Sequence, residues 1–138
     1  MRLSVPALLF LASLPAALAV AADKPEDVAV PRAEAWLKLV DDGQYEKSWD
    51  EAAKLFKGAL TREKWAEAGR AARSPLGKLV SRKLASARYT ETLPGAPDGK
   101  YVVIQFAASF ENKKDAVETV TPMLDPDGVW RVSGYFIK

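Results

Sequence analysis

The sequence of 138 residues contains neither cysteine nor histidine. Without these side chains the protein cannot form a Ser-His-Asp or Cys-His triad, a disulfide or a cysteine redox centre, and nearly every zinc or haem site is excluded. Any acid–base chemistry would have to rely on carboxylates, lysine or tyrosine. We therefore expect no catalytic residue, no metal site and no cofactor, and a fold that is stabilised by packing alone.

A marked excess of one charge is also missing, since 20 Lys and Arg residues face 18 Asp and Glu residues. Proteins that bind nucleic acid or an anionic membrane surface usually carry a clear basic excess. The near balance argues against both as partners. The sequence also has no internal repeat and no low-complexity segment, and its length suits one domain.

The N-terminal 22 residues have the pattern of a secretory signal peptide. Arg2 supplies a positive charge, an apolar stretch runs to Leu18, and Ala17-Leu18-Ala19 or Ala19-Val20-Ala21 offers a small-residue cleavage site. A membrane anchor is the alternative, but two prolines interrupt the apolar stretch, and a spanning helix needs about 20 apolar residues. The sequence therefore predicts a periplasmic or secreted protein, without membrane insertion after cleavage, in which residues 23–138 form a single domain.

Helical spacing of apolar residues predicts three helices after a loose leader over residues 23–30. The first helix begins at Pro31, which suits the first position of a helix, and it ends at Asp41-Asp42-Gly43. Its apolar positions are Ala33, Trp36, Leu37 and Val40. The second helix spans residues 45–56 and the third residues 62–73.

The second half of the chain predicts four strands, over about residues 79–93, 102–110, 114–124 and 129–137. The second of these has a clear buried face, formed by Val102, Ile104, Phe106, Ala108 and Phe110. Short turns at Asn112-Lys113 and at Asp125-Pro126-Asp127-Gly128 join the last three strands. Three helices followed by a four-stranded antiparallel meander predict an α+β fold, with the helices packed on one face of the sheet.

The loop lengths set the register and so assign the remaining strand residues to faces. The helix-facing side is predicted to hold Val117, Thr119, Thr121, Met123, Trp130, Val132, Gly134 and Phe136. The outer side is predicted to hold Val103, Val120, Tyr135 and Ile137. An apolar sheet face left to water predicts a homodimer through these four residues. The alternative is a monomer in which Arg88 and Arg131 lie across the patch.

The same register predicts a small pocket on the helix-facing side. Thr119 lies opposite Gly134, so the hydroxyls of two threonines border a gap without a side chain. Including residues that would close this pocket or hold an acidic ligand group, the candidate ligand-binding residues are Trp49, Thr119, Thr121, Trp130, Gly134 and Arg82. The alternatives are structural: Gly134 admits a helix or a bend, the tryptophans belong to the core, and Arg73 and Arg82 are solvated ends of a helix and a strand.

Four segments carry a resemblance to a known family: WLKLVDDGQYEKSW (36–49), RSPLGKLVSR (73–82), LPGAPDGKYVVIQF (93–106) and ETVTPMLDPDGVWRVSGYFIK (118–138). In this order they resemble the DUF4019 family, small exported bacterial proteins of unknown function. More loosely, the ending DGVWRVSGYFIK is similar to the last strand of NTF2-like, or cystatin-like, proteins. That resemblance implies helices in the curve of a bent sheet, and it implies no activity.

For function, we expect an exported, non-enzymatic module that binds a small molecule or a protein partner. One alternative is an NTF2-like enzyme of the isomerase or hydratase type, which needs a carboxylate with a raised pKa inside its cavity. The predicted inner face offers only Glu91 for this role. The other alternative is a purely structural, oligomerising subunit.

Overall fold

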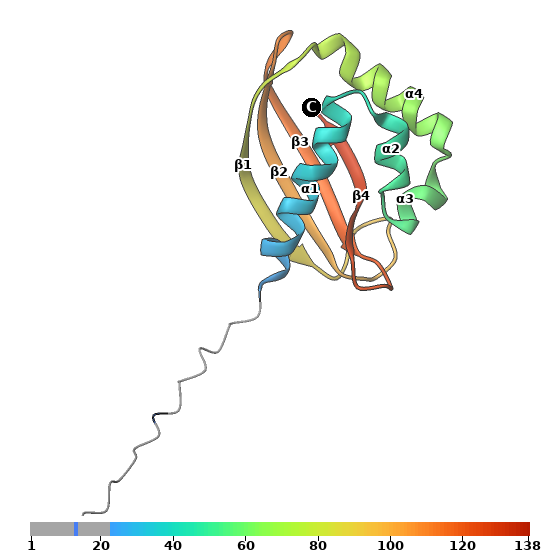
Figure 1. The fold of residues 1–138 in the computed structure, drawn as a ribbon, viewed down its shortest axis with the longest axis vertical. Helices are drawn as coiled ribbons and strands as arrows, with labels where there is room; N and C mark the ends of the chain where they lie inside the picture. The colour runs from blue at the N-terminus through green and yellow to red at the C-terminus, as the bar shows by residue number, and fades with distance from the viewer. Residues whose placement is uncertain (1–12, 14–22) are drawn as a thin grey trace, which may run out of the picture.

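The structure, a computed structural model, describes residue 13 and residues 23–138. Apart from Ser13, the predicted signal peptide lies outside the described residues. The described residues are drawn in colour in Figure 1. None of the helices in these ranges is both long enough and apolar enough to cross a membrane.

The first helix, α1, spans Pro25–Asp41 and is longer than predicted. The prediction of a loose leader over residues 23–30 is wrong, because Pro25 starts the first turn of the helix. The Asp27 carboxylate stabilises this turn by accepting a hydrogen bond from the Lys24 backbone N–H at 3.2 Å. Pro31 therefore lies inside the helix, where its ring removes one backbone hydrogen bond. Ala29 and Ala33, two residues before and two residues after Pro31, are both fully buried, so packing holds the helix through this point.

The second predicted helix is divided into α2 (Tyr45–Asp50) and α3 (Lys54–Ala59). Between them, the Ala53 backbone N–H donates a hydrogen bond to the Val132 carbonyl of the last strand at 2.8 Å. This bond ties the helical layer to the sheet. This hydrogen bond joins residues that are far apart in the chain, so the helical periodicity of residues 45–56 does not indicate the break between α2 and α3.

The last helix, α4, covers Arg62–Arg73, as predicted. Its N-cap is Thr61, whose side-chain oxygen accepts a hydrogen bond from the Lys64 backbone N–H at 3.2 Å. A short 3-10 helix, η1 (Ser74–Leu76), follows it and turns the chain toward the sheet.

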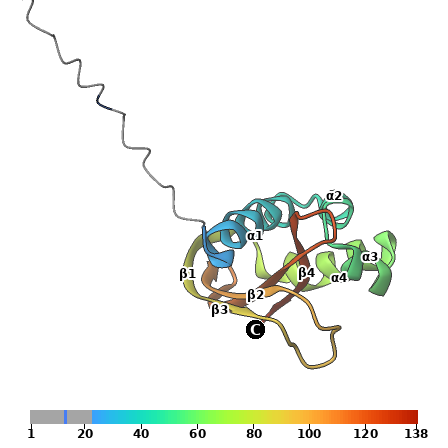
Figure 2. The same cartoon turned by 90° about the horizontal axis from the view of Figure 1, so that it is seen from below.

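The strands β1 (Leu79–Thr90), β2 (Tyr101–Phe110), β3 (Lys113–Leu124) and β4 (Trp130–Ile137) form one antiparallel sheet in the order β1-β2-β3-β4. In Figure 1, α1 crosses in front of this sheet, and α2, α3 and α4 lie on the side of β4. The view from below in Figure 2 shows α1 as a separate layer over the strands. The α+β fold, with N-terminal helices against a four-stranded antiparallel meander, is thus confirmed.

The loop between β2 and β3 is shifted by one residue from its predicted position. Phe110 pairs with Lys113, so the loop is Glu111-Asn112 and the prediction of Asn112-Lys113 is wrong. The 3-10 helix holds the loop in place, because the Asn112 backbone N–H donates to the Leu76 carbonyl at 2.9 Å. A contact from a distant segment therefore sets this register.

The faces of β3 are the reverse of those predicted. After an irregularity next to the loop, Phe106 pairs with Glu118 and Ile104 with Val120. Glu118 and Val120 therefore face the helices, and both are fully buried. The residues predicted to face the helices lie on the outer side instead; they are Val117, Thr119, Thr121 and Met123.

The fourth strand changes faces along its length. Trp130 and Val132 face the helices as predicted, and both are buried. The register then shifts by one residue beside Pro122 of β3, which cannot donate a backbone hydrogen bond to the ladder. Beyond the shift, Tyr135 faces the helices and Phe136 points outward, where it is 53% exposed. The prediction for these two residues is wrong.

An aromatic cluster fills the space between the helices and the sheet. The rings of Trp36, Phe56, Trp65 and Tyr135 lie with centroids between 5.0 and 6.4 Å apart in contacting pairs. The indole N–H groups of Trp36 and Trp65 donate to the carbonyl and hydroxyl oxygens of Ser48, both at 2.8 Å. These tryptophans therefore belong to the core, with their polar atoms satisfied.

Candidate functional site

Five side chains from five elements meet under the C-terminal end of α1. Asp41 ends α1 and Arg73 ends α4, while Arg82, Glu118 and Tyr135 lie on β1, β3 and β4. Glu118 is 0% exposed and Arg73 only 5% exposed. We call these five residues the ion cluster.

Arg82 joins the two carboxylates of the ion cluster. Its Nη1 and Nη2 atoms donate to Asp41 Oδ2 and Oδ1 at 2.7 and 2.9 Å, in bidentate geometry. Its Nε donates to Glu118 Oε1 at 2.7 Å. Arg82 therefore already donates three hydrogen bonds to carboxylates of the protein itself.

Arg73 completes the cluster from the side of α4. Its Nη2 donates to Asp41 Oδ1 at 2.7 Å, and its guanidinium lies 4.7 Å from the centroid of the Phe110 ring. Within the described ranges, its Nε and Nη1 have no hydrogen-bond partner. The alternative in which Arg73 and Arg82 are solvated chain ends is therefore wrong, because both are paired between helices and sheet.

Glu118 accepts a second hydrogen bond, from the Tyr135 hydroxyl to Oε2 at 2.6 Å. Burial, together with the nearby charge of Glu118, raises the pKa of Tyr135 above its ordinary value. Tyr135 therefore remains a hydrogen-bond donor, and both oxygens of Glu118 are engaged. The sequence did not indicate this buried carboxylate, because the predicted register put Glu118 on the outer face.

The ion cluster predicts a specific acid sensitivity. Burial by itself would raise the pKa of Asp41, but hydrogen bonds and charge from Arg82 and Arg73 outweigh it and hold the pKa below its ordinary value. The charged carboxylate thus stabilises the fold above its unfolded-state pKa of about 3.9, and this stabilisation is lost as the pH falls through the lower, folded-state pKa.

We therefore expect urea unfolding midpoints to fall from about pH 5 downward, and to fall less steeply in Asp41→Asn. The matched control is Asp42→Asn, which changes an exposed neighbour paired with Lys38 at 3.6 Å. Equal pH slopes for Asp41→Asn and the unmodified protein would show that Asp41 does not contribute in this way.

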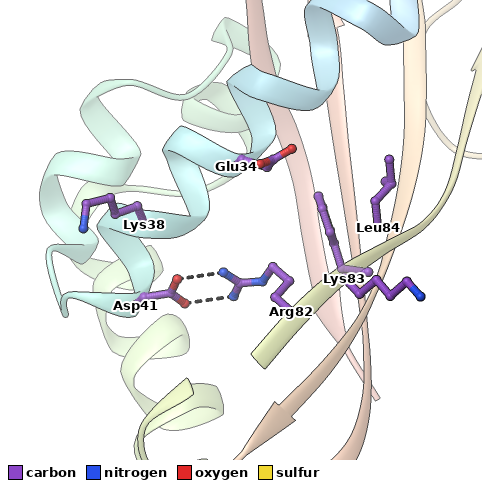
Figure 3. Close-up of a pocket in the computed structure, with 7 residues that line it drawn as sticks. Glu34, Lys38, Asp41, Arg82, Lys83 and Leu84 are labelled. Carbon is purple, nitrogen blue, oxygen red and sulfur yellow. Dashed lines mark hydrogen bonds and ion pairs between the residues drawn. The ribbon is translucent and has the colours of Figure 1, made fainter. Parts of the chain in front are cut away.

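A groove of about 580 Å³ runs between α1 and β1, beside the ion cluster (Figure 3). It is lined by residues of α1 and β1 and one of β2, namely Glu34, Lys38, Asp41, Arg82, Lys83, Leu84 and Phe106. Figure 3 shows the Asp41–Arg82 ion pair reaching from the helix to the strand. The ion pair therefore holds α1 at a fixed distance from β1, which keeps the groove open.

The floor of the groove is apolar. Leu84 pairs with Phe106, so its side chain is on the helix-facing side of β1. Phe106 is 2% exposed, but Leu84 is 45% exposed although it is on the helix-facing side. Glu34, Lys38 and Lys83 also line the groove. Figure 3 shows the Glu34 carboxylate on the β1 side of α1, whereas the ammonium groups of Lys38 and Lys83 extend away from the space between α1 and β1. An apolar floor with charged residues at its borders suits a ligand that is apolar in one part and charged in another.

The predicted pocket does not form, because its residues lie on opposite sides of the sheet. Thr119, Thr121 and Gly134 lie on the outer face, whereas Trp49 and Trp130 pack on the helix side. An added Cβ at Gly134 would meet no heavy atom within 4 Å, so this glycine does not admit a helix either. Arg82 is the one predicted ligand-binding residue that lines the groove described above.

The four residues predicted to form a homodimer interface also lie on different faces of the sheet. Val120 is fully buried under the helices, and Tyr135 belongs to the ion cluster. Ile137 pairs with Glu118, which puts it on the helix side, so Val103 alone of the four lies on the outer face. The outer face instead exposes Val117 (43%) and Phe136. Homodimer formation stays a prediction, but the four residues named for it do not form one surface.

A second recess of about 550 Å³ lies between α3, the loop 94–99 and the β3–β4 turn. Its lining is mostly apolar and includes Leu55, Pro97, Tyr101, Met123 and Pro126. Unlike the groove, it is not bordered by the ion cluster. In the part of the chain that the structure describes, no group of three or more acidic residues is placed to hold a metal ion.

Comparison with known proteins points to one family. The family described as "Protein of unknown function (DUF4019)" matches residues 32–135, which include α1 from Arg32 onward, the whole ion cluster and the groove. A search of curated proteins found no match.

Proposed function

Because the chain belongs to the DUF4019 family, whose description names no activity, we propose from the site alone that this protein is an exported, non-enzymatic binding module. Its ligand, a small molecule or a segment of a protein, occupies the groove between α1 and β1. The observation that carries the proposal is Leu84, a core-facing side chain that α1 leaves 45% exposed between charged residues.

The ion cluster supports a binding role over catalysis. An isomerase or hydratase would need a carboxylate that is free to take a proton from a substrate. Both oxygens of Glu118 accept hydrogen bonds, from Arg82 and Tyr135, and both oxygens of Asp41 accept them from arginines. The cluster positions the helix, and its carboxylate oxygens at the end of the groove are all partnered. Glu34, the other carboxylate that lines the groove, is exposed on α1 and is not enclosed within a cavity as the enzyme alternative requires.

The groove has properties that a small binding module needs. Its volume of about 580 Å³ lies within the range of about 300–1,000 Å³ that is usual for ligand sites. The Asp41–Arg82 pair fixes its width before any ligand arrives, which lowers the entropic cost of binding. Export of the mature chain is part of this proposal, and it is supported by the signal-peptide pattern of the first residues.

The dye anilinonaphthalene sulfonate tests the proposal, because it combines apolar rings with one negative charge. We expect saturable fluorescence enhancement that Leu84→Asp weakens by about tenfold or more, since burying a leucine side chain contributes about 1.5–3 kcal/mol and 1.4 kcal/mol is tenfold in affinity. Half-exposed Leu84 can be changed without a large loss of stability.

The matched control is Val117→Asp, which places the same charge at a residue of similar exposure on the opposite sheet face. Its dye affinity should equal that of the unmodified protein. If both variants weaken dye binding equally, or if neither variant weakens it, the groove is not the binding site.

A further inference from the structure

We propose that the ligand of the groove is an extended peptide that pairs with the free edge of β1 as a fifth strand of the sheet. The inference rests on the proposed function, since it names the class of ligand for the same groove. It goes further in assigning the main recognition to backbone atoms of β1.

The edge of β1 is open along the groove. β1 is the first strand in the sheet order, so only β2 pairs with it. Every second backbone N–H and C=O of an edge strand points away from the sheet. In the part of the chain that the structure describes, one side chain caps such an amide: the Tyr89 N–H donates to Glu26 Oε1 at 3.2 Å.

That cap marks where the open edge ends. Glu26 is in the first turn of α1, which therefore covers the C-terminal part of β1. The register of β1 with β2 is irregular between Leu79 and Ser81 and again between Leu84 and Ser86. The regular edge left uncovered is thus residues 81–84, and Arg82, Lys83 and Leu84 of this stretch line the groove.

The geometry of an added strand fits the groove. A fifth strand would lie about 4.7–4.9 Å from β1, with alternate side chains on opposite sides of the sheet. On one side these side chains would extend over Leu84 and toward α1, where the apolar floor is uncovered. The Asp41–Arg82 pair lies inside this space and keeps the helix from closing onto the edge.

The charges on β1 indicate which side chains the peptide should carry. Within Leu79–Thr90 there are three basic residues, Arg82, Lys83 and Arg88, and no acidic residue. Arg82 is neutralised in the ion cluster. Lys83 pairs with Ala107 and so stands on the outer face of β1, within the open stretch 81–84, and Arg88 stands on the same face beyond that stretch. Opposite charges on neighbouring strands attract. The fitting peptide is one that alternates apolar and acidic residues. A second copy fits less well, because two basic edges would face each other.

The test uses the mature protein and the capped hexapeptide Ac-Asp-Val-Asp-Val-Asp-Val-NH2. In an extended chain all the valine N–H groups point to one edge and all the aspartate N–H groups to the other. Two further peptides carry N-methyl groups on the three valines or on the three aspartates. Both have the same composition and number of methyl groups, and each blocks one edge.

We expect one methylated peptide to lose affinity by about tenfold or more while the other stays within about threefold of the parent, because only one edge donates to β1. Amide hydrogen exchange at residues 81–84 should slow when the parent peptide binds. Lys83→Glu should weaken binding of the parent peptide, whereas Lys64→Glu, which changes an exposed residue of α4, should not.

Several results would overturn the inference. If both methylated peptides bind like the parent, or if the dye binds in the groove and the parent peptide does not, strand addition is wrong and the groove remains a site for small molecules. If neither dye nor peptide binds there, the proposed function falls as well. If the outward-pointing amides of residues 81–84 are already protected without peptide and the protein sediments as a dimer, a second copy occupies the edge instead.

Discussion

Replacing Arg82 with alanine is expected to lower the free energy of unfolding by about 3–5 kcal/mol. The substitution leaves Glu118, which is fully buried, with Tyr135 as its remaining hydrogen-bond donor. It also removes two of the three N–H groups that donate to Asp41. The positive charge that remains near Glu118 is Arg73, whose Nη1 lies 3.9 Å from Oε2 and donates no hydrogen bond to it. Removing the hydrogen-bonded partner of a buried carboxylate is among the costliest single changes in a folded domain.

The matched control for this prediction is Arg62→Ala. Arg62 also pairs with a carboxylate, that of Asp50 at 3.0 Å, but both side chains are nearly half exposed. Exposed pairs contribute about 0–1 kcal/mol. Comparing the free energies of urea unfolding of the two variants therefore shows how much of the loss comes from burial of the carboxylate and how much from loss of an ion pair alone. A loss of less than about 1 kcal/mol for Arg82→Ala would mean that the ion cluster does not hold α1 to the sheet.

The second large effect is expected for Phe106→Ala, which should destabilise the protein by about 3–5 kcal/mol. Phe106 is 2% exposed and belongs to the main core, between the aromatic cluster and the groove. Truncating it removes apolar contacts and leaves a cavity that the neighbouring strands cannot fill. For a domain of this size such a loss is a large part of the total stability.

Gln105→Ala is the control for Phe106→Ala, because Gln105 is the next residue of the same strand and is exposed on the opposite face. It should change the unfolding midpoint little. If both substitutions lower the midpoint equally, the assignment of the faces of β2 is wrong.

The elements of the fold follow from local patterns in the sequence. The alternating apolar residues of β2 and the capped helix α4 were both predicted correctly, since each depends on neighbouring residues along the chain. Two errors had local causes that the sequence did contain. Pro25 can start a helix as well as Pro31, and Pro122 within a strand is a sign of an irregular ladder.

The site could not be predicted in the same way, because it depends on contacts between distant segments. The 3-10 helix holds the loop at Glu111-Asn112, and the irregularity of the ladder between Ala108 and Phe110, next to this loop, moves Glu118 from the surface to the core. The partners of Asp41 are 32 and 41 residues away in the chain. The sequence indicated Arg73 and Arg82 as residues that could hold an acidic group. Only the packing of α1 and α4 on the sheet shows that this group is Asp41, together with Glu118 for Arg82.

These contacts link the stability of the protein to its proposed function. The ion cluster fixes the position of α1 over the sheet, and in this position Leu84 remains 45% exposed. The arrangement that pairs the buried charges therefore also leaves the groove open. Variants of the cluster should therefore disturb binding indirectly, whereas Leu84→Asp should disturb it directly and leave the cluster intact.

The most direct test of the groove is an amide NMR titration of the mature protein with anilinonaphthalene sulfonate. If the groove is the binding site, the largest saturable shifts should fall in residues 34–41 of α1 and 82–84 of β1. Shifts centred instead on residues 54–59 and 97–101, which border the second recess, would contradict the proposal, as would the absence of any saturable shift.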